Sequence, residues 1–293
     1  MTQTTIRTTE KIWPTVDSYK LLDHGEVRLL DYMGSDDDIV QAARVSYGSG
    51  TSQKHDTKGL LRYLVRHRHT SPIEMCELKF YVKMPIFVAR QWIRHRMASV
   101  NEYSARYSIM KDEFYIPKAE HIKKQGSQNK QGSGGIVNSM DVANWQHTIG
   151  CSMNAEFTTY QQALQCEISR ETARINLPLA TYTEWVWKID LHNLLHFLSL
   201  RQDSHAQYEI RVYADAIGKI VEALFPVTWQ AFLDYKKNAI TFSDHELDAL
   251  AKLTEGLTLT KQQVLDQIPA AIFSAGERQE FLDKLGHILD ITV

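Results

Sequence analysis

Apolar residues repeat along the chain with two different periods, and the change of period marks alternating helices and strands. From Glu77 to Met84 every second residue is apolar, which predicts a strand with one buried face. From about Asp141 to Ile168 the large apolar residues return every three or four positions, which predicts a long amphipathic helix. We expect its apolar stripe to pack against the core or another subunit, rather than to hold a cofactor.

The same patterns, combined with capping and turn residues, predict the other elements of the first 240 residues. Strands are expected at Val27–Leu30 and Thr181–Ile189. Helices are expected from Ser35 to about Tyr47, Thr57 to His67, Pro72 onward, Pro85 toward Arg94, Ser169 to Leu177, Leu191 to Leu200 and Ser204 to Pro226. The segment 123–135 has four glycines and no apolar residue, which is typical of a mobile loop.

The tail beyond Tyr235 contains three residue pairs with the spacing of a helix capping box. The pairs are Ser243/Glu246, Thr260/Gln263 and Ser274/Glu277. They predict three short helices without a cluster of catalytic residue types. We therefore expect an α/β (α+β) fold with a mixed central sheet flanked by helices, divided into a main domain of residues 1–240 and a helical C-terminal extension of residues 241–293.

Composition narrows the class of protein without naming a function. The chain has 293 residues, of which 43% are hydrophobic and 23% charged, as in ordinary globular proteins. A net charge of −2 argues against a general nucleic-acid binder. Three cysteines without metal-binding spacing indicate a reducing compartment. The N-terminus lacks the apolar core of a signal peptide, and no apolar run reaches the roughly 20 residues that span a bilayer, so we expect a cytoplasmic protein.

Several familiar signatures are missing from the sequence. It contains no GxGxxG, no Walker A loop, no HExxH and no CxxC. The dinucleotide-fold, P-loop, zincin and redox-pair interpretations therefore lose their main support. No cysteine lies in a recognisable nucleophile context, which weakens the case for thiol catalysis.

Residues 90–108 form a dense basic and aromatic stretch. Its arginines, histidine and aromatic residues are Arg90, Trp92, Arg94, His95, Arg96, Tyr103, Arg106 and Tyr107, and Glu102 is its one acidic residue. A solvated helix face would balance such charge with nearby acids. Guanidinium groups beside aromatic rings suit phosphates and flat heterocycles. A plain basic surface, solvated or bound to nucleic acid, is the competing interpretation.

Two further groups of polar residues lie on or directly after the apolar helix expected at Leu191–Leu200. Arg201 comes directly after this helix, so its guanidinium should emerge at the edge of the core, where it could stabilise a developing anion. A salt bridge to Asp203 is the alternative. His192 and His196 have the i, i+4 spacing of metal ligands, but polar residues lining a cleft or a helix surface are the favoured interpretation.

The residues Arg94-His95-Arg96, followed after seven residues by Ser104, resemble the RHR-x7-S signature of the flavin-dependent thymidylate synthases. The segments around it, together with His69–Glu74 and Leu200–Gln207, resemble the same family. The resemblance extends over roughly residues 25–235. It implies the reductive methylation of dUMP to dTMP, with methylenetetrahydrofolate as carbon donor and NADPH as reductant through FAD.

The resemblance also implies a set of site residues. Flavin contacts are implied for Ser71, Glu74, Arg94, His95, Arg96, Glu102, Asp190, His192 and His196. Contacts with dUMP are implied for Gln91, Arg94, Glu102, Ser104, Arg106, Arg174 and Arg201. No metal is expected. Arg201 would be the catalytic residue that favours the N3-deprotonated uracil, and Ser104 would orient the substrate rather than act as nucleophile.

Members of the resembled family are homotetramers whose active sites combine residues from several subunits, so we expect the same assembly here. Two alternatives from other classes stay open at this stage. A nucleic-acid-binding module using residues 90–108 would bind oligonucleotides in a salt-sensitive way. A metal-dependent nucleotide hydrolase using His192 and His196 would lose its activity to chelators.

Overall fold

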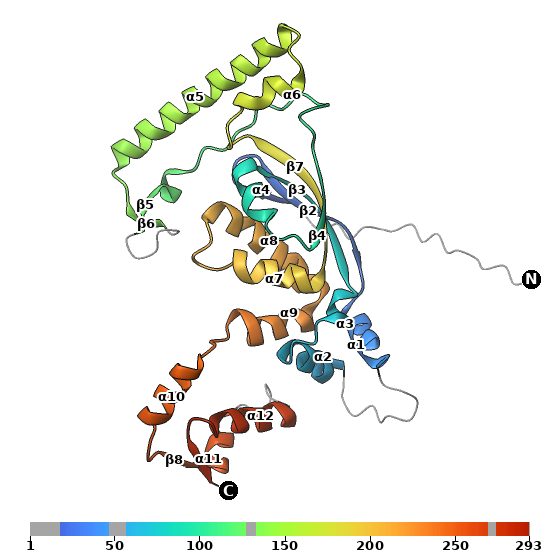
Figure 1. The fold of residues 1–293 in the computed structure, drawn as a ribbon, viewed down its shortest axis with the longest axis vertical. Helices are drawn as coiled ribbons and strands as arrows, with labels where there is room; N and C mark the ends of the chain where they lie inside the picture. The colour runs from blue at the N-terminus through green and yellow to red at the C-terminus, as the bar shows by residue number, and fades with distance from the viewer. Residues whose placement is uncertain (1–17, 47–56, 127–132, 269–273, 293) are drawn as a thin grey trace, which may run out of the picture. The chain divides into compact units, whose positions relative to one another are not determined.

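The computed structural model describes residues 18–46, 57–126, 133–268 and 274–292. The chain divides into two compact units, residues 1–232 and 233–293, and each unit is described by itself. The first unit contains a five-stranded sheet with the strand order β1-β2-β3-β7-β4 (Figure 1). Its strands are β1 (Tyr19–Leu21), β2 (Gly25–Met33), β3 (Glu77–Pro85), β4 (Ala98–Glu102) and β7 (Tyr182–Asp190).

The expected α+β class is confirmed, and the pairing within the sheet is antiparallel at every junction. The sheet is therefore not a mixture of parallel and antiparallel strands. Its first pair, β1 and β2, is a short hairpin that the sequence patterns did not indicate. The strand expected at Val27–Leu30 lies inside β2.

Strands β3 and β7 form the centre of the sheet and supply much of its buried face. The side chains of Phe80 and Trp187 are fully buried and lie opposite each other across the two strands. Large apolar side chains that are buried in this way each stabilise a fold by about 1.5–3 kcal/mol. The strands expected at Glu77–Met84 and Thr181–Ile189 are confirmed, because their alternating pattern matches the pleat.

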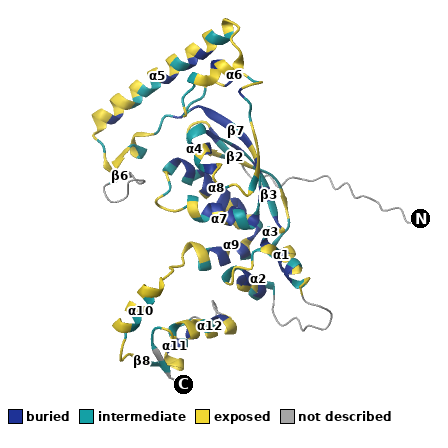
Figure 2. Ribbon diagram, in the orientation of Figure 1, coloured by how far each residue is buried: buried dark blue, intermediate teal, exposed yellow. Residues whose placement is uncertain are grey.

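Helices pack against the sheet and bury its apolar face (Figure 2). The helices of this unit are α1 (Asp36–Arg44), α2 (Thr57–Arg66), α3 (Ser71–Glu74), α4 (Ile86–Trp92), α5 (Ser139–Gln165), α6 (Arg170–Ala173), α7 (Leu191–Arg201), α8 (Tyr208–Leu224) and α9 (Pro226–Phe232), with 3-10 turns η1 (Ala119–His121) and η2 (Arg174–Asn176). Trp92 at the end of α4 is fully buried. Its ring stacks on Phe197 of α7 and meets Trp187 of β7 edge-on, so α4, α7 and the sheet share one core.

The predicted helix starts are correct where a side chain caps the helix. The Ser35 hydroxyl accepts from the Asp38 amide and begins α1, which ends at Arg44 rather than near Tyr47, a residue outside the described part of the chain. The cap predicted at Ser204 is wrong. Helix α8 begins after Gln207, and the intervening residues form a turn in which the Asp203 carboxylate accepts from the His205 amide.

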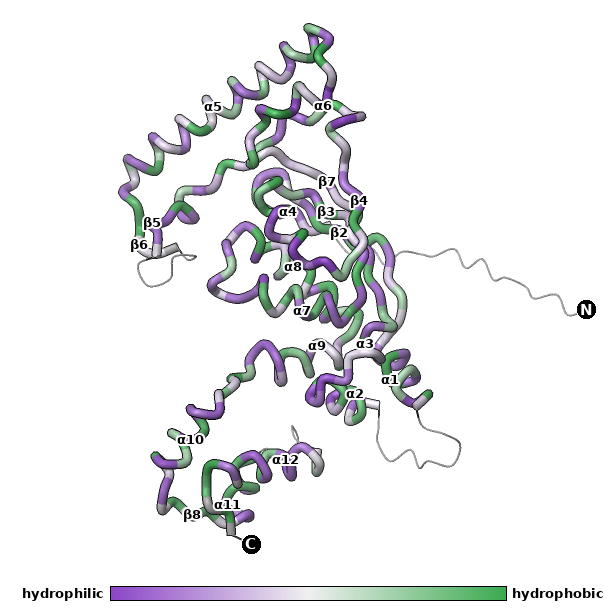
Figure 3. Tube along the Cα trace, viewed as in Figure 1, coloured by the Kyte–Doolittle hydropathy of each residue, from purple (hydrophilic) through white to green (hydrophobic). Residues whose placement is uncertain are grey.

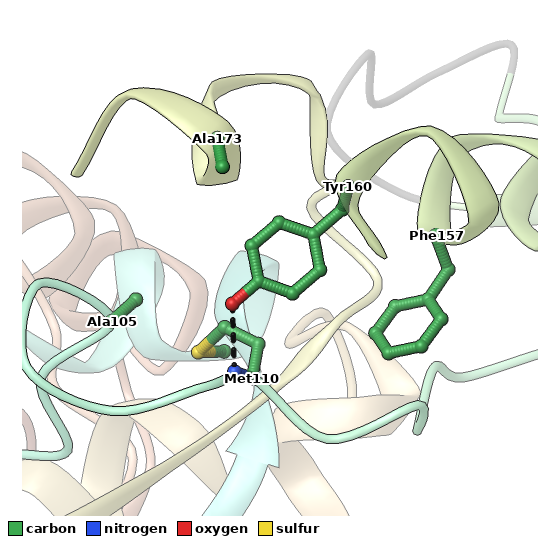
Figure 4. Close-up of a cluster of buried hydrophobic side chains, with 5 residues drawn as sticks. All are labelled: Ala105, Met110, Phe157, Tyr160 and Ala173. Atoms are coloured by element: carbon green, nitrogen blue, oxygen red, sulfur yellow. Dashed lines mark hydrogen bonds between the residues drawn. The ribbon is translucent and has the colours of Figure 1, made fainter. Parts of the chain in front are cut away.

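The long helix predicted from Asp141 is confirmed as α5, along which apolar and polar residues alternate (Figure 3). Part of its apolar stripe is buried in a cluster that contains Phe157 and Tyr160 (Figure 4). Trp145, from the same stripe, is 45% exposed in the single chain. The loop expected at 123–135 contains two short paired strands, β5 (Lys123–Gln125) and β6 (Ser133–Ile136), and residues 127–132 lie outside the described part of the chain.

In the second unit, the three α-helices each begin at a predicted capping box. Its elements are the π-helical turn η3 (Leu233–Lys237), α10 (Asp244–Leu253), β8 (Thr258–Thr260), α11 (Lys261–Asp266), α12 (Ala275–Leu285) and β9 (Asp290–Thr292). Both reciprocal hydrogen bonds of the box are present at Ser243/Glu246, Thr260/Gln263 and Ser274/Glu277. Nowhere in the described residues does a helix combine the length and the apolar character needed to cross a membrane.

Candidate functional site

Arg201 is the last residue of α7, where the helix leaves the core. The next residue, Gln202, ends the helix, and its side-chain amide donates to the Ala214 carbonyl of α8 over 3.3 Å. This contact requires a glycine at position 218, because a Cβ there would lie 2.5 Å from the Gln202 amide nitrogen. The end of α7 is thereby fixed against α8, and Arg201 emerges from a rigid support.

The Arg201 guanidinium is held by two acceptors from the segment that follows β3. Its Nε donates to His95 Nε2 over 3.1 Å, and its Nη2 donates to the Gln91 carbonyl over 3.2 Å. Burial lowers the pKa of Arg201, but the group stays charged at physiological pH. The alternative partner, Asp203, instead contacts both the amide and the ring of His205, and these hydrogen bonds lower the pKa of Asp203.

The His95 ring lies between α7 side chains. It meets the Phe197 ring edge-on with a centroid distance of 4.9 Å, and the His196 ring lies 5.9 Å away. Burial, followed by the neighbouring Arg201 and His196, lowers the pKa of His95 to about 4. The imidazole is therefore neutral at physiological pH, as an acceptor from an arginine must be.

Gln91 joins this group to the start of α8. Its side-chain amide donates to the Gln207 side-chain oxygen over 2.5 Å. Gln207 directly precedes α8. In the first turn of α8, the buried carboxylate of Glu209 accepts a hydrogen bond from the Tyr115 hydroxyl over 3.2 Å. The segment of Gln91 and His95 thus contacts Arg201 directly and the start of α8 through Gln207.

Glu102 lies at the end of the edge strand β4. The hydroxyl of Thr183, which is 2% exposed on β7, donates to the Glu102 carboxylate over 2.6 Å. The following amide, that of Tyr103, donates to the Glu184 carbonyl over 2.8 Å. These contacts fix the carboxylate where the chain turns from β4 toward Ser104.

Ser104 and Arg106 lie in a tight turn supported by α5 and α6. The Ser104 hydroxyl accepts from the Arg106 amide over 3.3 Å. The Arg106 guanidinium makes an ion pair with Glu171 of α6 at 3.0 Å, and both side chains are more than half exposed. Beneath the turn, the Tyr160 hydroxyl accepts from the buried Met110 amide over 3.0 Å (Figure 4). Arg174 begins η2 on the same support and is exposed.

The remaining expected cofactor residues lie around the start of α7. The Asp190 carboxylate caps α7 by accepting from the Asn193 amide over 2.9 Å. Helix α3, with Ser71 and Glu74, contacts α7. His196 is exposed and His192 is partly exposed. In the ranges that the structure describes, no group of three or more His, Cys, Asp or Glu side chains is placed to hold a metal ion.

The structure therefore brings together part of the expected site. Gln91, His95, His196 and Arg201 form one group, and Ser104, Arg106 and Arg174 lie on the separate support of α5 and α6. Arg94 and Arg96 are exposed in the turn that precedes β4. The sequence interpretation missed the supporting partners Gln207, Thr183, Glu171 and Asn193, for which residue type alone gives no signal.

The exposed side chains suit a nucleotide cofactor such as a flavin. Arg94 and Arg96 offer permanently charged groups for a diphosphate, and Ser71 and His192 add hydrogen-bonding groups. The half-buried Arg201 instead suits a heterocycle that gains negative charge, because its charge is permanent and partly desolvated.

Comparisons with known proteins identify the family of the chain. The protein-family model described as "Thymidylate synthase complementing protein" matches residues 28–227. A flavin-dependent thymidylate synthase from Wolbachia pipientis wMel is 51% identical over 247 residues, which cover 84% of this chain and 87% of the relative. One from Ehrlichia ruminantium strain Gardel is 47% identical over 270 residues, which cover 86% of this chain and 91% of the relative.

Among solved structures, the chain matches a UMP/dUMP methylase, PolB from Streptomyces cacaoi, bound with 5-Br dUMP. The TM-score is 0.67 and the sequence identity 34%, and the match covers 75% of this chain and 99% of that chain. Fold and relatives thus define an enzyme of the methyltransferase class, built on an antiparallel α+β sheet. Within that class, the chain belongs to the flavin-dependent thymidylate synthase family.

Proposed function

We propose that the protein converts dUMP to dTMP by reductive methylation, with methylenetetrahydrofolate as carbon donor and NADPH as reductant through FAD. The observation that carries this proposal is the held guanidinium of Arg201, which is bound by His95 and by the Gln91 carbonyl at the edge of the core. Relatives named for thymidylate synthesis and a solved methylase bound with a dUMP analogue support the choice of reaction and substrate.

Arg201 is the proposed catalytic residue. Its guanidinium would lie against the uracil and stabilise the N3-deprotonated form, which raises the electron density at C5 for attack on the methylene carbon. A cation in this position helps most when it does not have to reorganise during the reaction. Its two bonds to His95 and Gln91 provide that fixed orientation.

The phosphate of dUMP would bind Arg106 and Arg174. Both side chains are exposed on the support formed by α5 and α6, and guanidinium groups can bind phosphate through two parallel hydrogen bonds. The other proposed substrate ligands are Gln91, Arg94, Glu102 and Ser104. Ser104 would orient the nucleotide, since its hydroxyl already accepts from the Arg106 amide.

The proposed ligands of FAD are Ser71, Glu74, Arg94, His95, Arg96, Glu102, Asp190, His192 and His196. When bound, FAD would supply the hydride-transfer chemistry, and the protein would supply position and charge. We also propose that no cysteine acts as nucleophile. Burial raises the pKa of Cys76 to about 11, which leaves its thiol protonated at physiological pH.

We further propose a cytoplasmic homotetramer whose active sites combine residues of several subunits. Two features support the assembly. Arg201 and Arg106 are held by different elements of the chain, and α5 exposes Trp145 of its apolar stripe, as well as Met140 in its first turn, in the single chain. The catalytic domain would be residues 1–240, with residues 241–293 as a helical extension.

The purified protein should be yellow and should make dTMP from dUMP only when NADPH and methylenetetrahydrofolate are both present. Colourless protein that stays inactive after FAD is added would overturn the proposal. In Arg201→Ala we expect the flavin content to be retained and turnover to be lost. Unchanged turnover in this variant would reject the role of Arg201.

A further inference from the structure

His95 connects the basic stretch with Arg201 through its side chain. Its Nε2 is the acceptor for Arg201 Nε at 3.1 Å, and its ring packs edge-on against Phe197. The ring is half-buried, whereas Arg94 and Arg96 on either side of it are exposed. The three residues of the motif therefore differ in burial, and the central one lies against side chains of α7.

We propose that His95 is a positioning residue for Arg201, whose guanidinium it holds in the orientation that substrate activation requires. The inference rests on the proposed function, because it deepens the role given to Arg201 there. The same side chain is one of the proposed ligands of FAD, and the flavin content of the His95 variants separates the two roles.

The geometry of the guanidinium supports this role. Arginine has five N–H donors. One of these N–H groups donates to His95 and another to the Gln91 carbonyl, so the others can donate to a ligand. The two hydrogen bonds start at different nitrogens of the guanidinium, Nε and Nη2. Together they restrict the orientation of the guanidinium plane.

The charge state of the ring fits the same role. A protonated imidazole could not accept from Arg201 and would repel it. Among the described residues, the charged or titratable groups that act on the ring are Arg201 and His196 on α7, and neither is an acid. Arg94 and Arg96 flank it in sequence. This environment keeps the imidazole neutral and its Nε2 lone pair available.

A pair of substitutions separates hydrogen bonding from simple packing. His95→Phe keeps a flat ring but removes the acceptor, and His95→Gln restores a side-chain oxygen near the position of Nε2. His245→Phe, which replaces an exposed histidine of α10, is the matched control. We would measure kcat, the KM for dUMP, and the flavin content from the visible spectrum.

We expect His95→Phe to lower kcat roughly 10- to 100-fold, the effect of losing one hydrogen bond to a charged group. Flavin content and the KM for dUMP should change far less. His95→Gln should recover most of the loss, and His245→Phe should match the wild type. Unchanged kcat in His95→Phe, loss of flavin in that variant, or a His95→Gln variant as slow as His95→Phe would each overturn the inference.

A second measurement does not depend on turnover. The His95 imidazole can be titrated by NMR in selectively histidine-labelled protein, in the wild type and in Arg201→Ala. We expect the pKa of His95 to rise toward the ordinary value of 6.5 in Arg201→Ala, because that variant removes a positive neighbour and the donor on Nε2. An unchanged pKa of His95 in Arg201→Ala would contradict the contact between His95 and Arg201. Wild-type protein without dTMP synthesis would instead overturn the proposed function and leave this result interpretable.

Discussion

The Thr183 hydroxyl donates to the Glu102 carboxylate over 2.6 Å, and this contact joins the edge strand β4 to its neighbour β7. Thr183 is buried, while Glu102 lies at the exposed end of its strand. The hydrogen bond therefore couples the position of an expected ligand to the core of the sheet.

Thr183→Val should remove the hydrogen bond that orients the Glu102 carboxylate, with little change in packing, because valine and threonine have nearly the same shape. We expect the free energy of unfolding to fall by about 1 kcal/mol, the usual net value of a hydrogen bond. Turnover should fall because Glu102 loses its orientation. Urea unfolding and steady-state kinetics measure both effects, and Thr183→Ser, which keeps the hydroxyl but loses a buried methyl group, should keep the turnover of the wild type. Wild-type turnover in Thr183→Val would show that Glu102 needs no such support.

Tyr160→Phe should destabilise the protein through a lost acceptor in the buried cluster. The Tyr160 hydroxyl accepts from the Met110 amide, and a buried amide without a partner costs about 1–3 kcal/mol. Tyr103→Phe is the matched control, since its hydroxyl donates to the Ile109 carbonyl at an exposed site. Urea unfolding of the two variants should show the larger loss for Tyr160→Phe. Equal losses would contradict the argument from burial.

Stability should depend on pH through His95. Its pKa is lowered from 6.5 to about 4 in the folded state, so between these values the unfolded chain binds a proton that the folded chain does not bind. Stability should therefore fall as the pH falls from about 6.5 toward 4, and this contribution should vanish above that window. Urea unfolding across this range should give a shallower pH dependence for His95→Gln than for the wild type. Parallel curves would reject the lowered pKa.

The capping box of α12 should matter more than that of α10. Glu277 is buried, accepts from the Ser274 amide, and also accepts a hydrogen bond from the Tyr235 hydroxyl, whereas Glu246 is exposed. Glu277→Ala should cost about 1–3 kcal/mol, because it removes two partly buried hydrogen bonds. Glu246→Ala should cost less. Amide hydrogen exchange in α12 and α10 measures the two effects, and equal loss of protection would contradict this ranking.

The sequence predicted the elements that depend on neighbouring residues. The three capping boxes and the strand pattern of β3 are local, and all of them are confirmed. Strand β4 was missed because its residues lie within the basic stretch and its pairing partner, β7, is distant in sequence. The His95–Arg201 contact joins residues 106 positions apart, so no pattern of neighbouring residues could predict it. The family resemblance implied a set of candidate site residues, but it gave no indication of which of them would touch.

The Arg106–Glu171 ion pair permits a test of the proposed phosphate site. An exposed ion pair is worth little to stability, so substitutions here should leave folding nearly unchanged. Arg106→Ala removes the ion pair and the proposed phosphate ligand together, whereas Glu171→Gln removes only the ion pair. We expect Arg106→Ala to raise the KM for dUMP about tenfold or more, the effect of losing a charge-assisted hydrogen bond. Glu171→Gln should raise it far less, because the guanidinium is still present. Steady-state kinetics at varied dUMP concentration measures both values, and an equal rise in the two variants would show that Arg106 acts only through Glu171.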